Sequence, residues 1–155
     1  MAKIEYLTDY PSFTETVARW IYEEFIHGVR PGITFEKILE AVKNANKAKL
    51  PIRLIALVDG SCAGTVSIVS NDLRCRAYTP WLASLYVDPP YRKNKIGEQL
   101  VERVKEIAKE LGYGELYLRT EFAGDYYRAR NWAHVETCLD DEFQLKTDVF
   151  KDRFM

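Results

Sequence analysis

Apolar residues along the chain recur at two different spacings, and each spacing predicts one kind of element. Helical spacing, with apolar residues three or four positions apart, runs through residues 13–25 and again through residues 96–111. Shorter runs rich in β-branched and aromatic residues predict strands. These runs cover residues 3–7, 52–58, 62–69, 82–87, 115–119, 133–139 and 143–150.

Turn and capping residues place the boundaries between these elements. The sequence Ser-Phe-Thr-Glu at residues 12–15 matches a capping box, so we expect a helix to begin there. A second helix is predicted over residues 34–47 and a short one over residues 125–130. Asp59-Gly60 separates two strands and favours a tight hairpin, and Gly112 is a typical residue for ending a helix.

The predicted order of elements is β-αα-ββ-β-α-β-α-β-β, which indicates a single α/β (α+β) domain over residues 1–155. The strand–helix–strand unit of residues 82–118 predicts a right-handed parallel crossover. The hairpin before it is antiparallel. We therefore expect a mixed, twisted sheet of about seven strands with helices on both faces.

Composition and charge exclude several classes of function. The net charge is −1, so no overall electric field favours a nucleic acid or a membrane surface as partner. Cys62, Cys75 and Cys138 are odd in number and widely spaced, which suits neither a disulfide framework nor a metal site, and we predict no metal. No apolar run resembles a signal peptide or a membrane span, so a cytoplasmic location is expected.

The most informative stretch is residues 82–100, which reads as a strand, a sharp turn and a helix. A basic loop, Arg92-Lys93-Asn94-Lys95, leads from the strand into the helix. The start of a helix leaves backbone N–H groups unpaired and carries partial positive charge. With cations beside it, such a loop predicts a site for a phosphate-bearing ligand.

This stretch resembles the cofactor loop of the GNAT superfamily of acetyl-CoA-dependent N-acyltransferases. Arg92 and Gly97 match the family's Arg/Gln-x-x-Gly-x-Gly/Ala pattern after a strand, and Lys95 stands where the family usually has its first glycine. If that position needs a left-handed backbone, a side chain there costs about 1–2 kcal/mol. Direct contact between the Lys95 ammonium and a phosphate is the opposing interpretation, because it would offset the strain.

A second motif strengthens the resemblance. Residues 125–132 are similar to the family's Phe-Tyr-x-x-x-Gly-Phe/Trp segment, with Tyr127 at the tyrosine and Asn131 at the glycine. Asn is the non-glycine residue that best accepts a left-handed backbone, so it is a suitable replacement. The order of elements extends the resemblance to nearly the whole chain.

The resemblance implies acetyl-CoA as cosubstrate. It implies a splayed sheet whose gap holds the pantetheine arm, with the strand of residues 82–87 pairing with the arm's amide groups. Backbone N–H groups of residues 93–98 would hold the diphosphate, and Glu98 would turn its backbone rather than its carboxylate toward it. The implied cofactor residues are Leu85, Tyr86, Val87, Arg92, Lys93, Asn94, Lys95, Ile96, Gly97 and Glu98.

The resemblance also implies a reaction, direct transfer of the acetyl group to a primary amine, with Tyr127 as general acid. A phenol with a pKa of about 10 is protonated at neutral pH and can donate to the departing thiolate. An alkyl ammonium has a pKa of about 10.4, so a base must remove its proton. Trp81 stands where some relatives carry a glutamate, which leaves Asp72, Glu121 and Glu24 as candidates, the first two ranked ahead.

The acceptor site, by the same analogy, lies under the first two helices. Trp20 and Glu24 are candidates there, because aromatic rings beside carboxylates suit a cationic amine. Thr120 is a candidate for holding a water or an acceptor group at the end of its strand. The acceptor itself stays open among small-molecule and peptidyl amines.

Plainer interpretations stand beside these. Tyr127 and Trp20 also fit as packing aromatics, and Asp72 and Glu121 as solvated carboxylates. Lys95 and the missing glutamate also suit a module that binds CoA or acetyl-CoA without transfer, or one that recognises a protein partner. Exposed late strands in such folds often pair, so a homodimer is expected.

Overall fold

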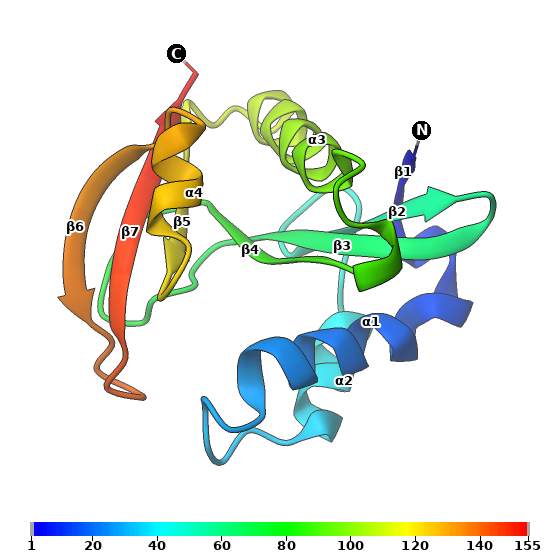
Figure 1. Cartoon of the computed structure of the whole chain (residues 1–155), viewed down its shortest axis with the longest axis horizontal. Coiled ribbons are helices and arrows are strands. Elements are labelled where there is room, and N and C mark those ends of the chain that lie inside the picture. The colour runs from blue at the N-terminus through cyan, green and yellow to red at the C-terminus, as the bar shows by residue number, and fades with distance from the viewer. Residues whose placement is uncertain (1, 155) are drawn as a thin grey trace.

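In the computed structural model, which describes residues 2–154, the β-rich runs form one seven-stranded sheet in the order β1-β2-β3-β4-β5-β7-β6 (Figure 1). Every neighbouring pair is antiparallel except β4 and β5, so the mixed sheet and the parallel crossover are confirmed. The strands are β1 (Lys3–Tyr6), β2 (Ile52–Val58), β3 (Ser61–Val69), β4 (Trp81–Val87), β5 (Glu115–Thr120), β6 (Ala133–Leu139) and β7 (Lys146–Arg153).

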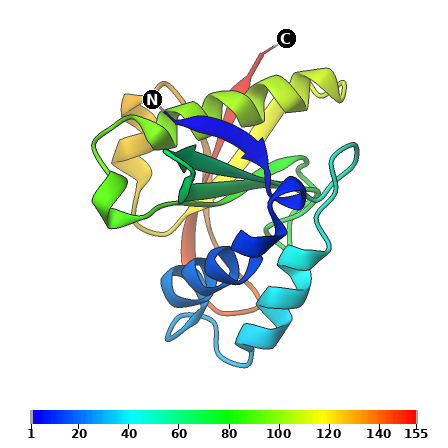
Figure 2. The same cartoon turned by 90° about the vertical axis from the view of Figure 1, so that its right-hand side faces the viewer.

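Helices cover both faces of the sheet, because β2 is apolar on both of its sides. Ile52 and Leu54 pack in one cluster with residues of α3, and Ile55 and Leu57 pack in another with residues of α1 and α2. Figure 2 shows α3 above the sheet and the first two helices below it. The helices are α1 (Thr14–Ile21), α2 (Phe35–Lys43), α3 (Ile96–Glu110) and α4 (Gly124–Ala129).

α1 begins within the predicted segment, but without the predicted cap. Pro11–Phe13 form a 3-10 turn, α1 begins at Thr14, and no side chain within the described residues caps it, so the predicted capping box is wrong. The side-chain cap belongs to α2, where Thr34 Oγ1 accepts from the Lys37 N–H at 3.2 Å. That helix also ends earlier than predicted, at Lys43.

Beyond α1 the chain continues as a π-helix, Tyr22–Ile26, which the sequence pattern did not predict. Its wider turn is closed by the His27 N–H, which donates to the Tyr22 carbonyl at 2.7 Å. Segments of this kind occur frequently at functional sites, because they redirect the side chains that they carry. Glu24 lies in this segment.

The last strand also starts later than predicted, at Lys146. The reason is a side-chain-capped turn: Asp140 Oδ1 accepts from the N–H groups of Glu142 and Phe143 at 2.7 and 3.1 Å. Side-chain acceptance of this kind stabilises a turn in place of ladder pairing. The turn between β6 and β7 thereby reaches back toward the end of β5.

Candidate active site

The sheet opens between β4 and β5. Trp81 is paired with Tyr117, and no further pair joins these two strands in the described part of the chain (Figure 1). β4 also carries one residue more than β3 between Ala83 and Tyr86, so it bulges at Ser84, whose φ is 54°. The splayed gap implied by the resemblance is therefore present, and the β5 side of β4 offers backbone groups to a ligand.

The loop after β4 presents a row of free backbone N–H groups. The first hydrogen bond of α3 runs from the Gln99 N–H to the Lys95 carbonyl at 3.0 Å. For residues 93–98, no protein acceptor of a backbone N–H lies among the residues that the structure describes. Lys93 and Lys95 have φ values of 68° and 61°, both left-handed, which gives the loop the concave shape that binds anions.

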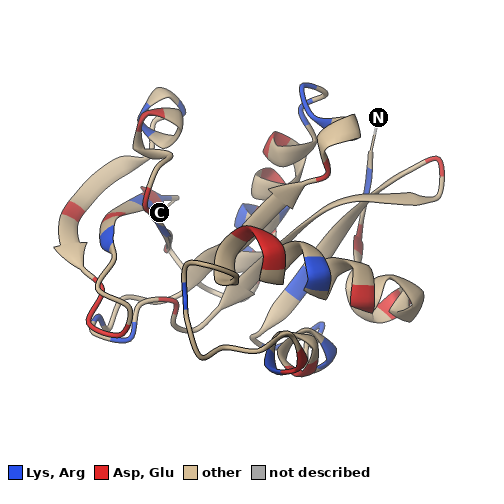
Figure 3. Cartoon of the chain, turned by 60° about the horizontal axis from the view of Figure 1, so that its bottom comes forward, with Lys and Arg blue, Asp and Glu red and all other residues tan. Residues whose placement is uncertain are grey.

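Charge and open space favour an anion at this point. Figure 3 shows Lys and Arg gathered in the loop that leads into α3, whereas both signs are interspersed over most of the other elements. A Cβ built on Gly97 would meet Val87 Cγ2 at 3.8 Å and the Tyr126 hydroxyl at 4.0 Å, so the helix end is not covered by closely packed backbone. The Glu98 carboxylate pairs with Arg130 at 3.5 Å.

Arg92 holds the end of β4 in place. Its Nε donates to the Val87 carbonyl at 2.8 Å, and its guanidinium lies 5.4 Å from the centre of the Tyr86 ring. Trp20 packs against the same Tyr86 ring, with the two ring centres 5.4 Å apart. Arg92 therefore shapes the loop, and Trp20 lies outside the cavity described below.

Tyr127 lies on α4, where the side chain is buried. Its ring packs edge-on against Trp132 at 6.0 Å and lies 6.1 Å from Phe150. Burial raises the pKa of Tyr127 to about 12, so the phenol keeps its proton at neutral pH. Asn131, just beyond the helix, has a φ of 67°, which confirms that this position takes a left-handed backbone.

A cavity of about 620 Å³ lies beside the gap. Its walls come from the π-helix, α2, the middle of β4, the end of β5 and the turn between β6 and β7, with further side chains from β2, the loop after β3 and α4. It brings together six of the residues predicted from the sequence, namely Glu24, Asp72, Leu85, Thr120, Glu121 and Tyr127.

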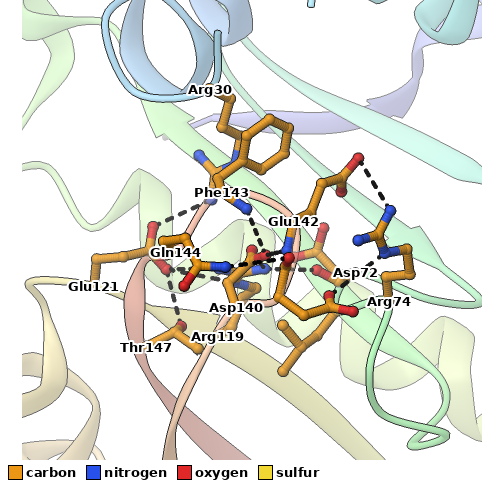
Figure 4. Close-up of polar contacts among 12 residues, drawn as sticks. Arg30, Asp72, Arg74, Arg119, Glu121, Asp140, Glu142, Phe143, Gln144 and Thr147 are labelled. Carbon is orange, nitrogen blue, oxygen red and sulfur yellow. Dashed lines mark hydrogen bonds and ion pairs between the residues drawn. The ribbon is translucent and has the colours of Figure 1, made fainter. Parts of the chain in front are cut away.

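A chain of partly buried ion pairs crosses one wall of this cavity (Figure 4). Arg30 lies 3.2 Å from Glu121, Glu121 lies 3.3 Å from Arg119, and Arg119 lies 2.8 Å from Asp140. Thr147 also donates to Glu121 at 2.9 Å. The lone pairs of Glu121 are thus engaged, which weakens its case as a base.

Asp72 has a different environment. Burial raises the pKa of the Asp72 carboxyl to about 6, although Arg119 and Arg30 oppose the rise. Its backbone carbonyl, rather than its carboxylate, accepts from Arg119 at 3.2 Å. A carboxyl group with this pKa is mostly ionised at neutral pH and can still take up a proton.

Thr120 has a structural contact as well, because its Oγ1 accepts from the Ala123 N–H at 2.9 Å before α4 begins.

Three buried or half-buried arginines of the cavity were not identified from the sequence, namely Arg30, Arg53 and Arg119. Two of them carried a signal, since Arg53 and Arg119 interrupt apolar strands. Arg53 lies two residues before the buried Ile55 on the same strand, so both side chains lie on the same covered face of the sheet.

Residues 2–154 contain no group of three or more His, Cys, Asp and Glu side chains placed to hold a metal ion. None of the helices described is long and apolar enough to cross a membrane.

The splayed sheet, the amide-lined loop and the buried tyrosine define an acyltransferase fold of one family. The sequence model of the acetyltransferase (GNAT) family matches residues 14–133, and the chain belongs to this family of acyltransferase enzymes. A search of curated protein sequences gave no significant match.

Solved structures support the same fold. An aminoglycoside 6'-N-acetyltransferase complexed with coenzyme A superposes with a TM-score of 0.77 at 14% identity, covering 99% of this chain and 97% of that one. A GNAT-family acetyltransferase from Staphylococcus aureus Mu50 gives 0.73 at 18% identity, with all of both chains covered (100% and 100%). N-acetylglutamate synthase from Neisseria gonorrhoeae, complexed with coenzyme A and N-acetyl-glutamate, gives 0.69 at 16% identity, covering 100% of this chain and 35% of that one.

Proposed function

We propose that the protein is an N-acetyltransferase that moves an acetyl group from acetyl-CoA directly to a primary amine within a ternary complex. One observation carries the proposal: the free N–H groups of residues 93–98 end beside the β4–β5 gap, and the cavity next to that gap contains Tyr127. The first feature suits a diphosphate and the second suits proton transfer.

Acetyl-CoA is the donor in this proposal. Its diphosphate would accept from the N–H groups of residues 93–98, with Lys93 and Lys95 beside them, and its pantetheine arm would pair with the backbone of Leu85 and Val87 along β4. The coenzyme A bound by two of the similar solved structures supports this assignment. The left-handed backbone at Lys95 supports it too, because the loop keeps its concave shape without the glycine.

The chemistry follows from the groups in the cavity. Asp72 takes a proton from the substrate ammonium, and the neutral amine attacks the thioester carbonyl carbon while a backbone N–H of β4 polarises the oxygen. The C–N bond forms, the C–S bond breaks, and Tyr127 donates its proton to the departing sulfur; the second proton that the nitrogen loses as it becomes an amide returns to the Tyr127 phenolate. The raised pKa of Tyr127, about 12, keeps the proton available for this step.

We assign the base to Asp72 rather than Glu121. Glu121 is engaged by two guanidinium groups and a hydroxyl, whereas the raised pKa of Asp72, about 6, lies near the working pH that favours a general base. Glu24 also lines the cavity and is the remaining candidate.

The test is acetyl-CoA turnover over a panel of primary amines, with the wild-type protein and Tyr127→Phe. We expect kcat to fall about 100-fold or more in Tyr127→Phe, while calorimetry gives an acetyl-CoA affinity within about threefold of the wild type. Tyr113→Phe, which removes a hydroxyl beyond the far end of α3, is the control and should change neither value.

Three results would count against the proposal. An unchanged kcat in Tyr127→Phe would remove that residue from the acid role. Binding of CoA without turnover of any amine would favour the alternative, a module that holds the cofactor without transfer. No binding of CoA at all would overturn both.

A further inference from the structure

Most charges that line the cavity are paired within the protein. Three are not paired among the described residues: Arg53 and Asp72, which are partly buried, and Glu24, which is exposed to solvent. Arg30, Arg74 and Arg119 each have a carboxylate oxygen within 4.0 Å. Arg53 has none within that distance among residues 2–154, and its Nη1 approaches only a hydroxyl, Thr65 Oγ1, at 3.5 Å. That hydroxyl donates its own proton to the Leu54 carbonyl at 2.8 Å.

Arg53 is therefore a cation that the fold itself does not neutralise. Burial lowers the pKa of Arg53 to about 10, and the more distant Asp72 is the charge that opposes this shift. At neutral pH the guanidinium still carries its charge. A buried cation without an ion partner is costly, and a bound anion in the cavity would remove that cost.

Asp72 is the complementary case. No Lys or Arg nitrogen in the described ranges lies within 4.0 Å of its carboxylate, although its backbone carbonyl is bonded to Arg119. Asp72 and Arg53 line the same cavity. One partly buried anion and one partly buried cation, neither of them ion-paired, thus line one cavity.

The sheet register places Arg53 two strands away from β4, which borders the β4–β5 gap. Arg53 on β2 is paired with Ser67 on β3, and Ser67 is paired with Ala83 on β4, next to the bulge at Ser84. Paired residues share a face of the sheet, and two strand spacings span about 10 Å. A small molecule lying across β3 would therefore reach from the gap to the Arg53 side chain.

We propose that the acceptor is a zwitterion, a free amino acid or a similarly small aminocarboxylate, whose carboxylate binds Arg53 while its amine faces Asp72. This inference rests on the proposed function and names its substrate class. A guanidinium fits a carboxylate with two parallel hydrogen bonds, which gives recognition as well as attraction. An amine that lacks the carboxylate leaves the Arg53 charge unmatched.

The experiment compares free amino acids with their own carboxamides, for example leucine with leucinamide, by kcat/KM for acetyl transfer. The amine of the carboxamide loses its proton more readily than that of the free acid, which by itself would make the carboxamide react faster. A preference for the free acid therefore cannot come from the reactivity of the amine. The wild-type protein should prefer the free acids at least about tenfold, as expected for a charge-assisted hydrogen bond. In Arg53→Gln this preference should disappear, so that the ratio of the two kcat/KM values is about one.

Two further variants make the test specific. Arg53→Lys keeps the charge without the planar fork and should retain part of the preference, which also covers the case of Arg53→Gln failing to fold. Arg74→Gln removes one positive charge from the rim, where Arg74 pairs with Asp141 at 3.4 Å, and should leave the preference within about threefold of the wild type.

The outcomes are separable. Carboxamides or simple amines turned over as well as the free acids by the wild type would overturn this inference and leave the transferase in place. An equal loss for both series in Arg53→Gln, with the preference retained, would also overturn it. Binding of acetyl-CoA without turnover of any acceptor would overturn the proposed function and the inference with it.

Discussion

The two halves of the candidate site are built in opposite ways. The cofactor half is made of backbone: free N–H groups at the start of α3, left-handed residues in the loop, and the β4 edge. The acceptor half is made of side chains that many separate segments bring to one cavity, and its polar wall is a chain of ion pairs.

The difference has a physical consequence. A backbone site depends on chain conformation, so most side chains in it can change without loss, and the motif that encodes it is short and local. A cavity lined by charges depends on each side chain, and its selectivity changes with single substitutions. We therefore expect cofactor binding to respond to backbone and space, and acceptor turnover to respond to individual charges.

The largest effect is expected from Gly97→Asp. The new carboxylate lies at the helix start, where it stabilises the helix but repels a diphosphate and competes for the same N–H groups. We expect the affinity for acetyl-CoA to fall about 100-fold or more while the melting temperature is unchanged or higher. Calorimetry and thermal unfolding measure the two effects, and neutral Gly97→Asn is the matched control with a smaller loss.

Equal affinities in the wild type and Gly97→Asp would show that the diphosphate binds elsewhere. Equal losses in the Asp and Asn variants would mean that volume, not charge, limits the site.

Asp72→Asn separates activity from stability in the acceptor half. We expect kcat to fall about 100-fold, because the amide cannot take the proton. Stability at pH 7 should rise by about 1 kcal/mol, because the charge that burial opposes is gone. Chemical unfolding at pH 7 checks the second part, and a decrease in stability there would show that the Asp72 charge is matched after all.

The size of this stability effect depends on pH. The folded-state pKa of Asp72 is about 6, raised from 3.8, so the native state holds this proton more tightly than the unfolded state does. The contribution of Asp72 to stability therefore falls as pH rises from about 4 through 6. The wild type and Asp72→Asn should converge in stability near pH 4, which unfolding curves at the two pH values will test.

The same ionisation of Asp72 should control activity, but activity needs the charged form, whereas stability is higher with the neutral form. Below about pH 6, kcat/KM should fall about tenfold per pH unit as Asp72 becomes protonated. Arg119 and Arg30 facing the carboxyl lower this pKa and Glu121 and Asp140 raise it, so burial decides the net direction. A pH–rate profile that is flat down to pH 5 would remove Asp72 as the base.

The smallest effect is expected from Lys95→Gly. Lys95 has a φ of 61°, so glycine should stabilise the fold by about 1 kcal/mol. If the ammonium helps to hold a phosphate, the affinity for acetyl-CoA should also fall, by about threefold to tenfold, and depend less on salt. Unfolding and calorimetry at two salt concentrations distinguish a strain-only position from a phosphate contact.

The same contrast explains what the sequence could predict. The cofactor half lies within one contiguous strand–loop–helix stretch, so periodicity and a local motif were enough to place it, together with the parallel crossover and the sheet. Asn131 was also interpreted correctly, because left-handed tolerance is a property of the residue itself.

The acceptor half could not be predicted in this way. Arg30, Arg53 and Asp72 lie on three segments distant in sequence, and only the folded sheet and the π-helix bring them to one cavity. The capping box failed for a different and local reason, since the 3-10 turn at Pro11–Phe13 takes the place of the predicted cap. The bulge at Ser84 left no signal in the alternation of β4.

The most direct test of the central claim is amide hydrogen exchange at residues 93–98, with and without acetyl-CoA. These N–H groups have no protein acceptor among the described residues, so they should exchange fast in the free protein. The account predicts that acetyl-CoA slows their exchange strongly, while amides at the far end of α3 change little. Saturating acetyl-CoA that leaves residues 93–98 unprotected would contradict it.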